Sequence, residues 1–337
     1  MTRPWRTAAA LLLACATTAL GGEKILNASY DVSRELYREY DAFFMAEWKR
    51  ERGTEVQVDV SHGGSSKQAR SVADGLQADV VTMNQETDVN LLVRAGLVNP
   101  EWRTKFPDNS SPYTSTIVFL VRKGNPHGIR DWPDLLKPGL SLIIPNPKTS
   151  GNGRYSYLAA WAWAKSQPGA TDKSARHFLR EIFSRVPVLE TGGRAATTTF
   201  IERGIGDVLL TFESEVLQIT RQFSADLFDM VTPSVSILAE FPVAVVDQVA
   251  DKRGTRAVAE DYLRKLWSEP GQQIIARQFL RPRNTAVAAA HSGMFPELRL
   301  VSVDELFGGW SAAQGQHFDS GGVFDQITTS AVLDAAP

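Results

Sequence analysis

The chain is nearly without cysteine, which limits the ways in which it can be stabilised. Cys15 is the only cysteine among 337 residues. An internal disulfide is therefore excluded, and stability has to come from packed cores. Hydrophobic residues make up 43% of the chain and charged residues 22%, as in a globular protein, and the length is sufficient for two lobes of ordinary size.

Long apolar runs are also lacking. Residues 7–20 are apolar or small throughout, but this run is shorter than the ~20 residues that a membrane-spanning helix needs. Because Arg3 and Arg6 precede it, residues 1–22 are predicted to be a signal peptide for export to the periplasm. A second interpretation is a lipoprotein signal, in which Cys15 anchors the protein to a membrane.

Positive charge is not in excess either. The chain has 36 Lys and Arg against 38 Asp and Glu, a net charge of −2, and loss of the two signal arginines would leave 34 against 38, or −4. A net negative charge disfavours binding to nucleic acid or to an anionic membrane, so we expect no nucleic-acid partner. An anionic ligand would have to be attracted by local dipoles.

Catalytic and metal-binding motifs are missing as well. Gly204-Ile205-Gly206 lacks the third glycine of a dinucleotide-binding loop, and no G-x-x-x-x-G-K-[ST] loop is present. Neither Ser65 nor Ser150 lies in a G-x-S-x-G nucleophile elbow. No metal-ligand spacing is seen among the five histidines, which are His62, His127, His177, His291 and His317. We therefore predict no catalytic residue, no metal site and no cofactor.

What the chain does have is a regular alternation of predicted strands and helices. Val56, Val58 and Val60 alternate as in a strand, for example, and apolar residues at helical spacing follow each such segment. This order predicts an α/β fold with largely parallel sheets. In such folds ligands bind where strands end and helices begin.

Turns rich in Ser, Thr and Gly occupy four of these strand ends. They follow Ser29, Val60, Ile144 and Glu190, and each opens a predicted helix. A helix N-terminus leaves backbone N–H groups unpaired and carries the positive end of the helix dipole, so it favours an anion. Any one of these turns is more simply interpreted as an ordinary helix cap. Four of them facing a shared cleft would form an oxyanion site.

The same turns carry a family resemblance. The motifs are Ser29-Tyr30-Asp31, Ser61-His62-Gly63-Gly64-Ser65, Asn146-Pro147-Lys148-Thr149-Ser150-Gly151-Asn152, Thr191-Gly192-Gly193-Arg194 and Ile237-Leu238-Ala239-Glu240-Phe241-Pro242. In order and spacing, from about Ile25 to about Ile327, they resemble the periplasmic sulfate/thiosulfate-binding proteins of ABC importers.

This resemblance implies a type II periplasmic-binding-protein fold, in which two α/β lobes close over a ligand cleft. The apolar runs at residues 116–121 and 237–246 mark the two predicted crossovers between the lobes. They assign residues 23–113 to the first lobe, residues 114–236 to the second, and residues 237–337 to a return to the first lobe and the C-terminal helices. The resemblance further implies a monomer that captures sulfate or thiosulfate and delivers it to a membrane permease. By the family pattern the ligand is held by backbone N–H groups at Asp31, Ser65, Gly151, Asn152 and Gly193 and by the Ser150 hydroxyl.

One matched position departs from the sulfate-type pattern. At the position of Phe212, sulfate-type members carry a tryptophan whose indole N–H donates a hydrogen bond to the ligand. The residues around Phe212 are similar to those of the thiosulfate-type branch, which leaves the preference between the two anions open.

Four basic or titratable residues lie beside the predicted donors, and each has two interpretations. Arg34, Arg154 and Arg194 would either compensate the ligand charge from behind the donors or form solvated or lobe–lobe ion pairs. His62 is expected to stabilise its turn rather than to act as a base. The alternative function is a secreted enzyme that acts on a sulfate or phosphate ester and uses the turns as an oxyanion cradle.

Overall fold

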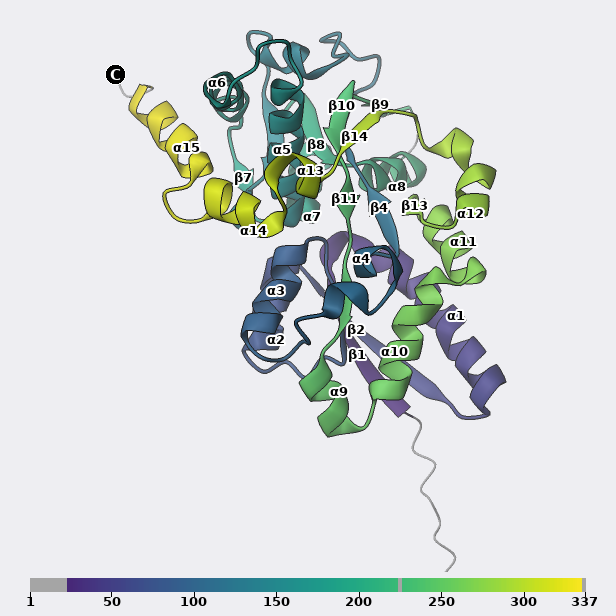
Figure 1. Cartoon of the computed structure of the whole chain (residues 1–337). Helices are drawn as coiled ribbons and strands as arrows, with labels where there is room; N and C mark the ends of the chain where they lie inside the picture. Colours follow the sequence, from purple (N-terminus) through teal and green to yellow (C-terminus); the bar gives the residue numbers. More distant parts are fainter. Residues whose placement is uncertain (1–22, 224–225, 335–337) are drawn as a thin grey trace, which may run out of the picture.

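Two β-sheets with helices packed around them organise the chain into two lobes (Figure 1). The computed structural model describes residues 23–223 and 226–334. The predicted signal peptide, with Cys15 and its lipoprotein interpretation, lies outside the described residues. The α/β class predicted from the sequence is confirmed.

The first sheet has the strand order β12-β3-β1-β2. Strand β1 pairs in parallel with β2 and β3, whereas β12 returns from later in the chain and pairs antiparallel to β3. The strands are β1 (Glu23–Tyr30), β2 (Val56–Gly63), β3 (Val80–Thr82) and β12 (Val243–Val245). The helices of this lobe are α1 (Arg34–Arg52), α2 (Ser65–Ala73), α3 (Glu86–Arg94), α9 (Asp247–Arg253) and α10 (Arg256–Arg264), with η1 (Asp31–Ser33) leading into α1.

The second sheet has the order β7-β6-β8-β5-β9. Its strands are β5 (Ile117–Arg122), β6 (Leu142–Pro145), β7 (Leu189–Glu190), β8 (Val208–Phe212) and β9 (Phe228–Val231). Its helices are α5 (Gly151–Lys165), α6 (Asp172–Phe183), α7 (Gly193–Ile201) and α8 (Glu213–Phe223).

This second sheet is less parallel than the sequence order predicts. Strand β5 pairs antiparallel with both β8 and β9, while β6 is parallel to β7 and β8. The cause is the way in which the chain enters the lobe. Strand β5 follows the crossing strand β4 (Tyr113–Ser115) almost directly, so it starts at the lobe boundary and runs away from it. Strands β6 and β8 run towards that boundary.

Short strands lie between the two lobes. Strands β11 (Ala239–Glu240) and β13 (Arg281–Pro282) pair antiparallel with the two sides of β4. Strand β10 (Val235–Ile237) pairs in parallel with β14 (Arg299–Val301) beside the second sheet (Figure 1). Four short helices precede the C-terminal region, namely η2 (Trp102–Thr104), α4 (Pro107–Ser110), η3 (Trp132–Leu136) and η4 (Lys265–Trp267). The remaining helices are α11 (Glu269–Arg277), α12 (Thr285–Ala290), η5 (Ser292–Met294), α13 (Val303–Phe307), α14 (Trp310–Ala313), η6 (Gln314–Phe318) and α15 (Val323–Asp334).

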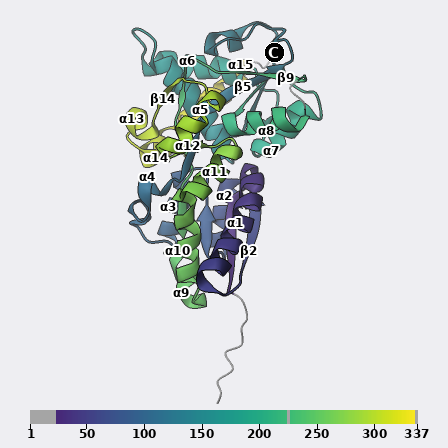
Figure 2. The same ribbon diagram turned by 90° about the vertical axis from the view of Figure 1, so that its right-hand side faces the viewer.

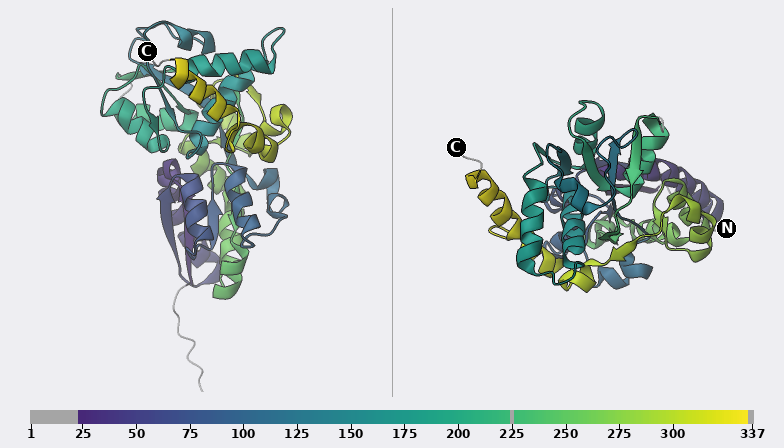
Figure 3. Two further views of the ribbon diagram at one scale, coloured as in Figure 1. Left: turned by 90° about the vertical axis from the view of Figure 1, so that its left-hand side faces the viewer. Right: turned by 90° about the horizontal axis from the view of Figure 1, so that it is seen from above.

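The last helices lie against the second lobe. Helices α14 and α15 flank α5 and α6 in the views of Figures 1 and 3, and α10 and α11 descend along the first lobe beside α1 (Figure 2). The C-terminal segment therefore adjoins the helix that opens with Gly151.

Helix α1 shows how the sequence pattern produces this packing. Leu36, Tyr40, Phe44 and Trp48 recur every four residues, so they share one face, and all four are buried. The helix ends at Gly53, whose φ of 69° is the left-handed conformation that favours glycine. The four side chains on this face belong to the hydrophobic core.

Candidate oxyanion-binding site

The helix starts predicted as anion sites come from both lobes and meet at the lobe boundary. A Cβ placed on Gly193, at the start of α7, would lie 2.9 Å from Asn152 Nδ2 and 3.5 Å from Val32 Cγ1. Asn152 is in the first turn of α5 and Val32 is in η1, directly after Asp31. Three of the four helix starts are therefore in contact.

The fourth start, that of α2, reaches the same place through Asn84. The Asn84 backbone N–H donates to Ser65 Oγ at 3.1 Å. A Cβ placed on Gly151 would lie only 2.0 Å from Asn84 Oδ1. Ser65 and Gly151 thus lie on either side of Asn84, and Ser65, Gly151 and Gly193 are all buried.

Asp31 presents a carboxylate as well as a backbone N–H at this boundary. Its Oδ1 accepts a hydrogen bond from the Val32 N–H at 3.0 Å, and its Oδ2 lies 3.2 Å from the Cβ position of Gly192. Burial raises the pKa of Asp31, and hydrogen bonds from backbone N–H groups, that of Arg194 first, oppose this rise. As a contact to the ligand, the sequence pattern indicated only the backbone N–H of Asp31.

Ser150 is the N-cap of α5. Its extended backbone precedes the helix, and its Oγ accepts a hydrogen bond from the Gly153 N–H at 3.3 Å. The side chain is 4% exposed. No acceptor for the hydroxyl proton is seen in the described part of the chain, so the hydroxyl can still donate to a ligand while it caps the helix.

The side chain of Asn152 is hydrogen-bonded to a buried network and does not share the capping and donor role of Ser150. Its Nδ2 donates to Thr211 Oγ1 at 2.7 Å, and Thr211 in turn donates to Glu215 Oε2 at 2.7 Å. Thr197 donates to the other oxygen, Glu215 Oε1, at 2.5 Å. Burial raises the pKa of Glu215. This network holds the Asn152 side chain in place, while its backbone N–H at the start of α5 is available to an anion.

Thr211, Thr197 and Glu215 were not identified as site residues from the sequence. Glu215 Oε2 would lie 3.3 Å from a Cβ on Gly193, which brings a buried carboxyl group next to a predicted anion donor. The sequence gives only a weak indication of Glu215, because an acidic residue in the first turn of a helix normally lies in solvent and interacts with the helix dipole.

The four residues predicted to surround the donors have different environments. Arg154 is buried and crosses the boundary, since its Nη1 donates to Thr87 Oγ1 of the first lobe at 3.1 Å. Arg194 Nη2 lies 3.6 Å from Glu35 Oε1, again across the boundary. Arg34 is exposed.

His62 lies in β2, not in the turn where the sequence pattern had put it, because β2 extends to Gly63 through pairing with β1. Its Nδ1 lies 3.4 Å from the Tyr30 carbonyl oxygen, and burial lowers its pKa. It is therefore mostly neutral at neutral pH.

Phe212 is fully buried at the end of β8. Its ring packs against Phe241 and Tyr155, with centroid distances of 5.2 Å and 5.8 Å, and Phe241 stacks on Tyr30. The ring is thus part of an aromatic cluster that joins the two lobes beside Asp31.

Among residues 23–223 and 226–334, no group of three or more His, Cys, Asp or Glu side chains is placed to hold a metal ion. Over the same ranges, no helix has both the length and the apolar character needed to cross a membrane.

Comparison with known proteins agrees with this geometry. A family model described as bacterial extracellular solute-binding protein matches residues 39–281. A thiosulfate-binding protein of Pseudomonas aeruginosa is 54% identical over 94% of this chain and 96% of its own length. A sulfate-binding protein of Salmonella typhimurium is 50% identical over 97% of this chain and 99% of its own. The solved structure of the sulfate-binding protein SubI from Mycobacterium tuberculosis has a TM-score of 0.79 at 33% identity, covering 88% of this chain and 100% of that one.

Proposed function

Because this chain belongs to the bacterial extracellular solute-binding proteins, we propose that it captures sulfate or thiosulfate between its two lobes and delivers the anion to an ABC importer. The observation that carries the proposal is the meeting of four helix starts from both lobes, at Asp31, Ser65, Gly151 and Gly193. Each offers backbone N–H groups whose dipoles favour an anion.

The proposed ligand contacts are the backbone N–H groups of the five predicted residues and the Ser150 hydroxyl. A hydrogen bond to a charged group contributes ~1.5–3 kcal/mol, so six supply on the order of 10–15 kcal/mol. Desolvation of a dianion and lobe closure oppose this by several kcal/mol. A net value near ~8 kcal/mol corresponds to micromolar affinity.

A site made of donors also selects among anions. Monoprotonated phosphate would bring an O–H group that needs an acceptor, and leaving that group unpaired in a buried site is unfavourable. Phe212 offers no hydrogen bond, only apolar surface. We therefore propose that the larger, softer sulfur of thiosulfate is tolerated at least as well as a sulfate oxygen.

We propose that residues 1–22 direct export to the periplasm, that the protein acts as a monomer, and that a membrane permease receives the ligand. Residues 23–113, 114–236 and 237–337 form the first lobe, the second lobe and the returning segment with the C-terminal helices. The relatives are named as binding proteins, and the alternative of a secreted enzyme has no support from them.

Binding without turnover tests this function. Dialysed protein should show a rise in melting temperature and a change in tryptophan fluorescence with sulfate or thiosulfate. Incubation with an aryl sulfate or an aryl phosphate should release no phenol. Ester cleavage above the buffer rate, or no response to either anion, would contradict the proposal.

A further inference from the structure

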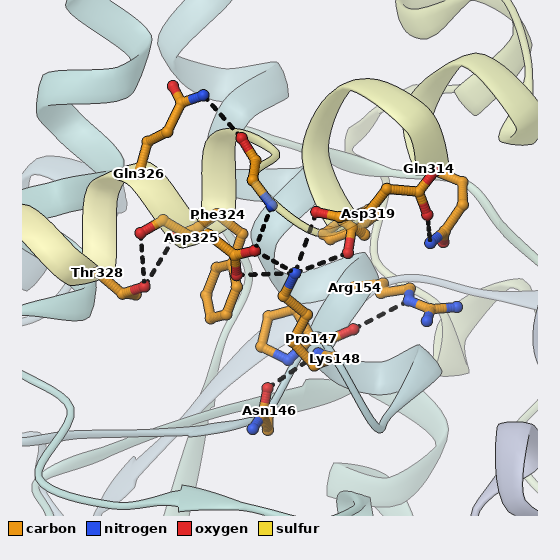
Figure 4. Close-up of polar contacts among 12 residues, drawn as sticks. Asn146, Pro147, Lys148, Arg154, Gln314, Asp319, Phe324, Asp325, Gln326 and Thr328 are labelled. Atoms are coloured by element: carbon orange, nitrogen blue, oxygen red, sulfur yellow. Dashed lines mark hydrogen bonds and ion pairs between the residues drawn. The ribbon is translucent and has the colours of Figure 1, made fainter.

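The loop between β6 and α5 is bound from outside the site by the C-terminal segment. Lys148 lies in this loop, two residues before Ser150. Its Nζ donates to the carbonyl oxygens of Phe318 at 2.8 Å and Asp319 at 3.2 Å, and lies 2.7 Å from Asp325 Oδ1 (Figure 4). Three residues of the C-terminal segment thus surround one ammonium group, which matches its three donors.

The C-terminal side of this contact is itself held in place. Asp325 Oδ2 accepts from the Gly321 N–H at 2.8 Å, and Gly321 has a φ of 78°, which favours glycine. The Lys148 ammonium, together with that N–H, lowers the pKa of the Asp325 carboxyl, which is therefore ionised at neutral pH. The Lys148 and Asp325 side chains are only 30% and 33% exposed, so solvent screens their attraction less than that of a surface pair.

Packing fixes the same segment to the body of α5. Tyr157, on α5, donates to or accepts from His317 Nδ1 at 2.8 Å, and its ring lies 5.1 Å from that of Phe318 and 6.1 Å from that of Phe324. The oxygens around Lys148 are therefore carried by a segment that is packed on the helix whose start they flank.

The other side of the loop is held by Arg154. Its Nε donates to the Pro147 carbonyl at 2.9 Å, and its guanidinium lies over the Phe318 ring at 5.6 Å. The backbone between Pro147 and Ser150 is thus fixed at both of its edges. The proposed donors Ser150, Gly151 and Asn152 follow directly.

We propose that the Lys148–Asp325 pair is a latch through which the C-terminal segment holds the loop in the conformation that presents Ser150, Gly151 and Asn152 to the oxyanion. This inference rests on the proposed function. Lys148 is a positioning residue that touches no ligand, and it slows release of the anion by keeping the donors aligned. Asp325 and the other C-terminal contacts of Lys148 lie beyond residues 39–281, the part of the chain that the family model matches.

Stopped-flow fluorescence on K148M, D325N and the double variant tests the latch. Because loosening a bound geometry mainly changes the dissociation rate, K148M should release thiosulfate or sulfate about tenfold faster, with a smaller change in association rate. D325N should have a smaller effect, since Lys148 keeps two carbonyl acceptors. The double variant should release no faster than K148M, because both changes remove the same interaction.

The matched control is K165M. Lys165 ends the same helix and pairs with Asp172 at 2.8 Å, with the lysine side chain 28% exposed, but far along α5 from the donors. It should leave both rates unchanged. The latch would be overturned if K165M released the anion as fast as K148M does. It would also be overturned if the dissociation rate of K148M equalled that of wild type.

Hydrogen–deuterium exchange separates this inference from the proposed function. In the protein without ligand, K148M should speed exchange at residues 149–153 and K165M should not. If the wild type bound neither anion, the proposed function would be wrong. The exchange rates of K148M and K165M would still show whether Lys148 holds the loop. Unchanged exchange at residues 149–153 in K148M would refute the latch.

Discussion

Asn84 Oδ1 faces the α-carbon of Gly151 across the lobe boundary, so closely that a Cβ on Gly151 would lie 2.0 Å from it. Asn84 follows β3 of the first sheet, and Gly151 opens α5 beside the second. The Asn84 oxygen is buried and has no hydrogen-bond partner among the described residues. A Cβ at position 151 would therefore force the Asn84 side chain to move, a constraint that a helix start alone would not impose.

Gly151→Ala is expected to weaken anion binding by ~1–3 kcal/mol, the cost of overpacking a close contact. The second lobe should stay folded, because the clash lies between lobes. Gly64→Ala is the matched control, since Gly64 is the N-cap of the site helix α2 and has nothing within 4 Å of its Cβ position. Titration of both variants, and of Gly151→Ala combined with Asn84→Ala, measures the effect. Wild-type affinity in Gly151→Ala would show that the lobes do not close on this contact.

Ser150→Ala is expected to weaken binding by ~1.5–3 kcal/mol, the contribution of one hydrogen bond to a charged group. Since Ser150 Oγ also caps α5 by accepting from the Gly153 N–H, stability should fall by ~1 kcal/mol. Calorimetry and urea unfolding separate the two effects. A stability loss with full affinity would leave Ser150 as a cap only.

The affinity should change less than about tenfold between pH 6 and 8, because the donors do not titrate and burial lowers the pKa of His62, which favours its neutral form. Any change should favour binding at lower pH, because burial raises the pKa of Glu215 and the protonated carboxyl group carries no charge to repel the dianion. Glu215→Gln should bind at least as tightly as wild type at pH 8 and show a flatter profile. Tighter wild-type binding at pH 8 than at pH 6 would contradict this account.

His317 should make the protein less stable in acid. Burial lowers its pKa from 6.5 to about 4. Between pH 6.5 and 4 the histidine is protonated in the unfolded chain but stays neutral in the folded chain. The contribution of neutral His317 to the free energy of unfolding is therefore fully present above pH 6.5 and is lost as the pH falls towards 4. The loss is on the order of 3 kcal/mol. Melting curves of wild type and His317→Gln should therefore converge as the pH falls, whereas a constant difference would exclude His317 as the cause.

The sequence predicted the strand ends and helix starts of the site because those follow from local rules. Turns rich in Ser and Gly after apolar strands mark Ser65, Gly151 and Gly193 without knowledge of the fold. Asn84, Glu215 and the Lys148–Asp325 contact could not be found in this way. Their roles depend on which distant segments meet, for example Lys148 and a helix some 170 residues later, and a local pattern carries no such information.

Phe212→Trp is expected to shift the preference towards sulfate by ~1–2 kcal/mol, if the indole N–H reaches the ligand as one buried hydrogen bond. The ring is already packed between Tyr155 and Phe241, so the larger side chain should also lower the melting temperature. Competition titrations of both proteins with sulfate and thiosulfate give the ratio. An unmoved ratio in the variant would show that position 212 does not face the anion.

The central claim, a dehydrated site built from uncharged donors, is tested most directly by calorimetric titration of the exported form with sulfate, thiosulfate, molybdate and phosphate. The account predicts one anion per chain, near-micromolar Kd values for sulfate and thiosulfate, thiosulfate bound at least as tightly as sulfate, and phosphate much more weakly. Phosphate bound as tightly as sulfate, or no heat with either sulfur oxyanion, would contradict it.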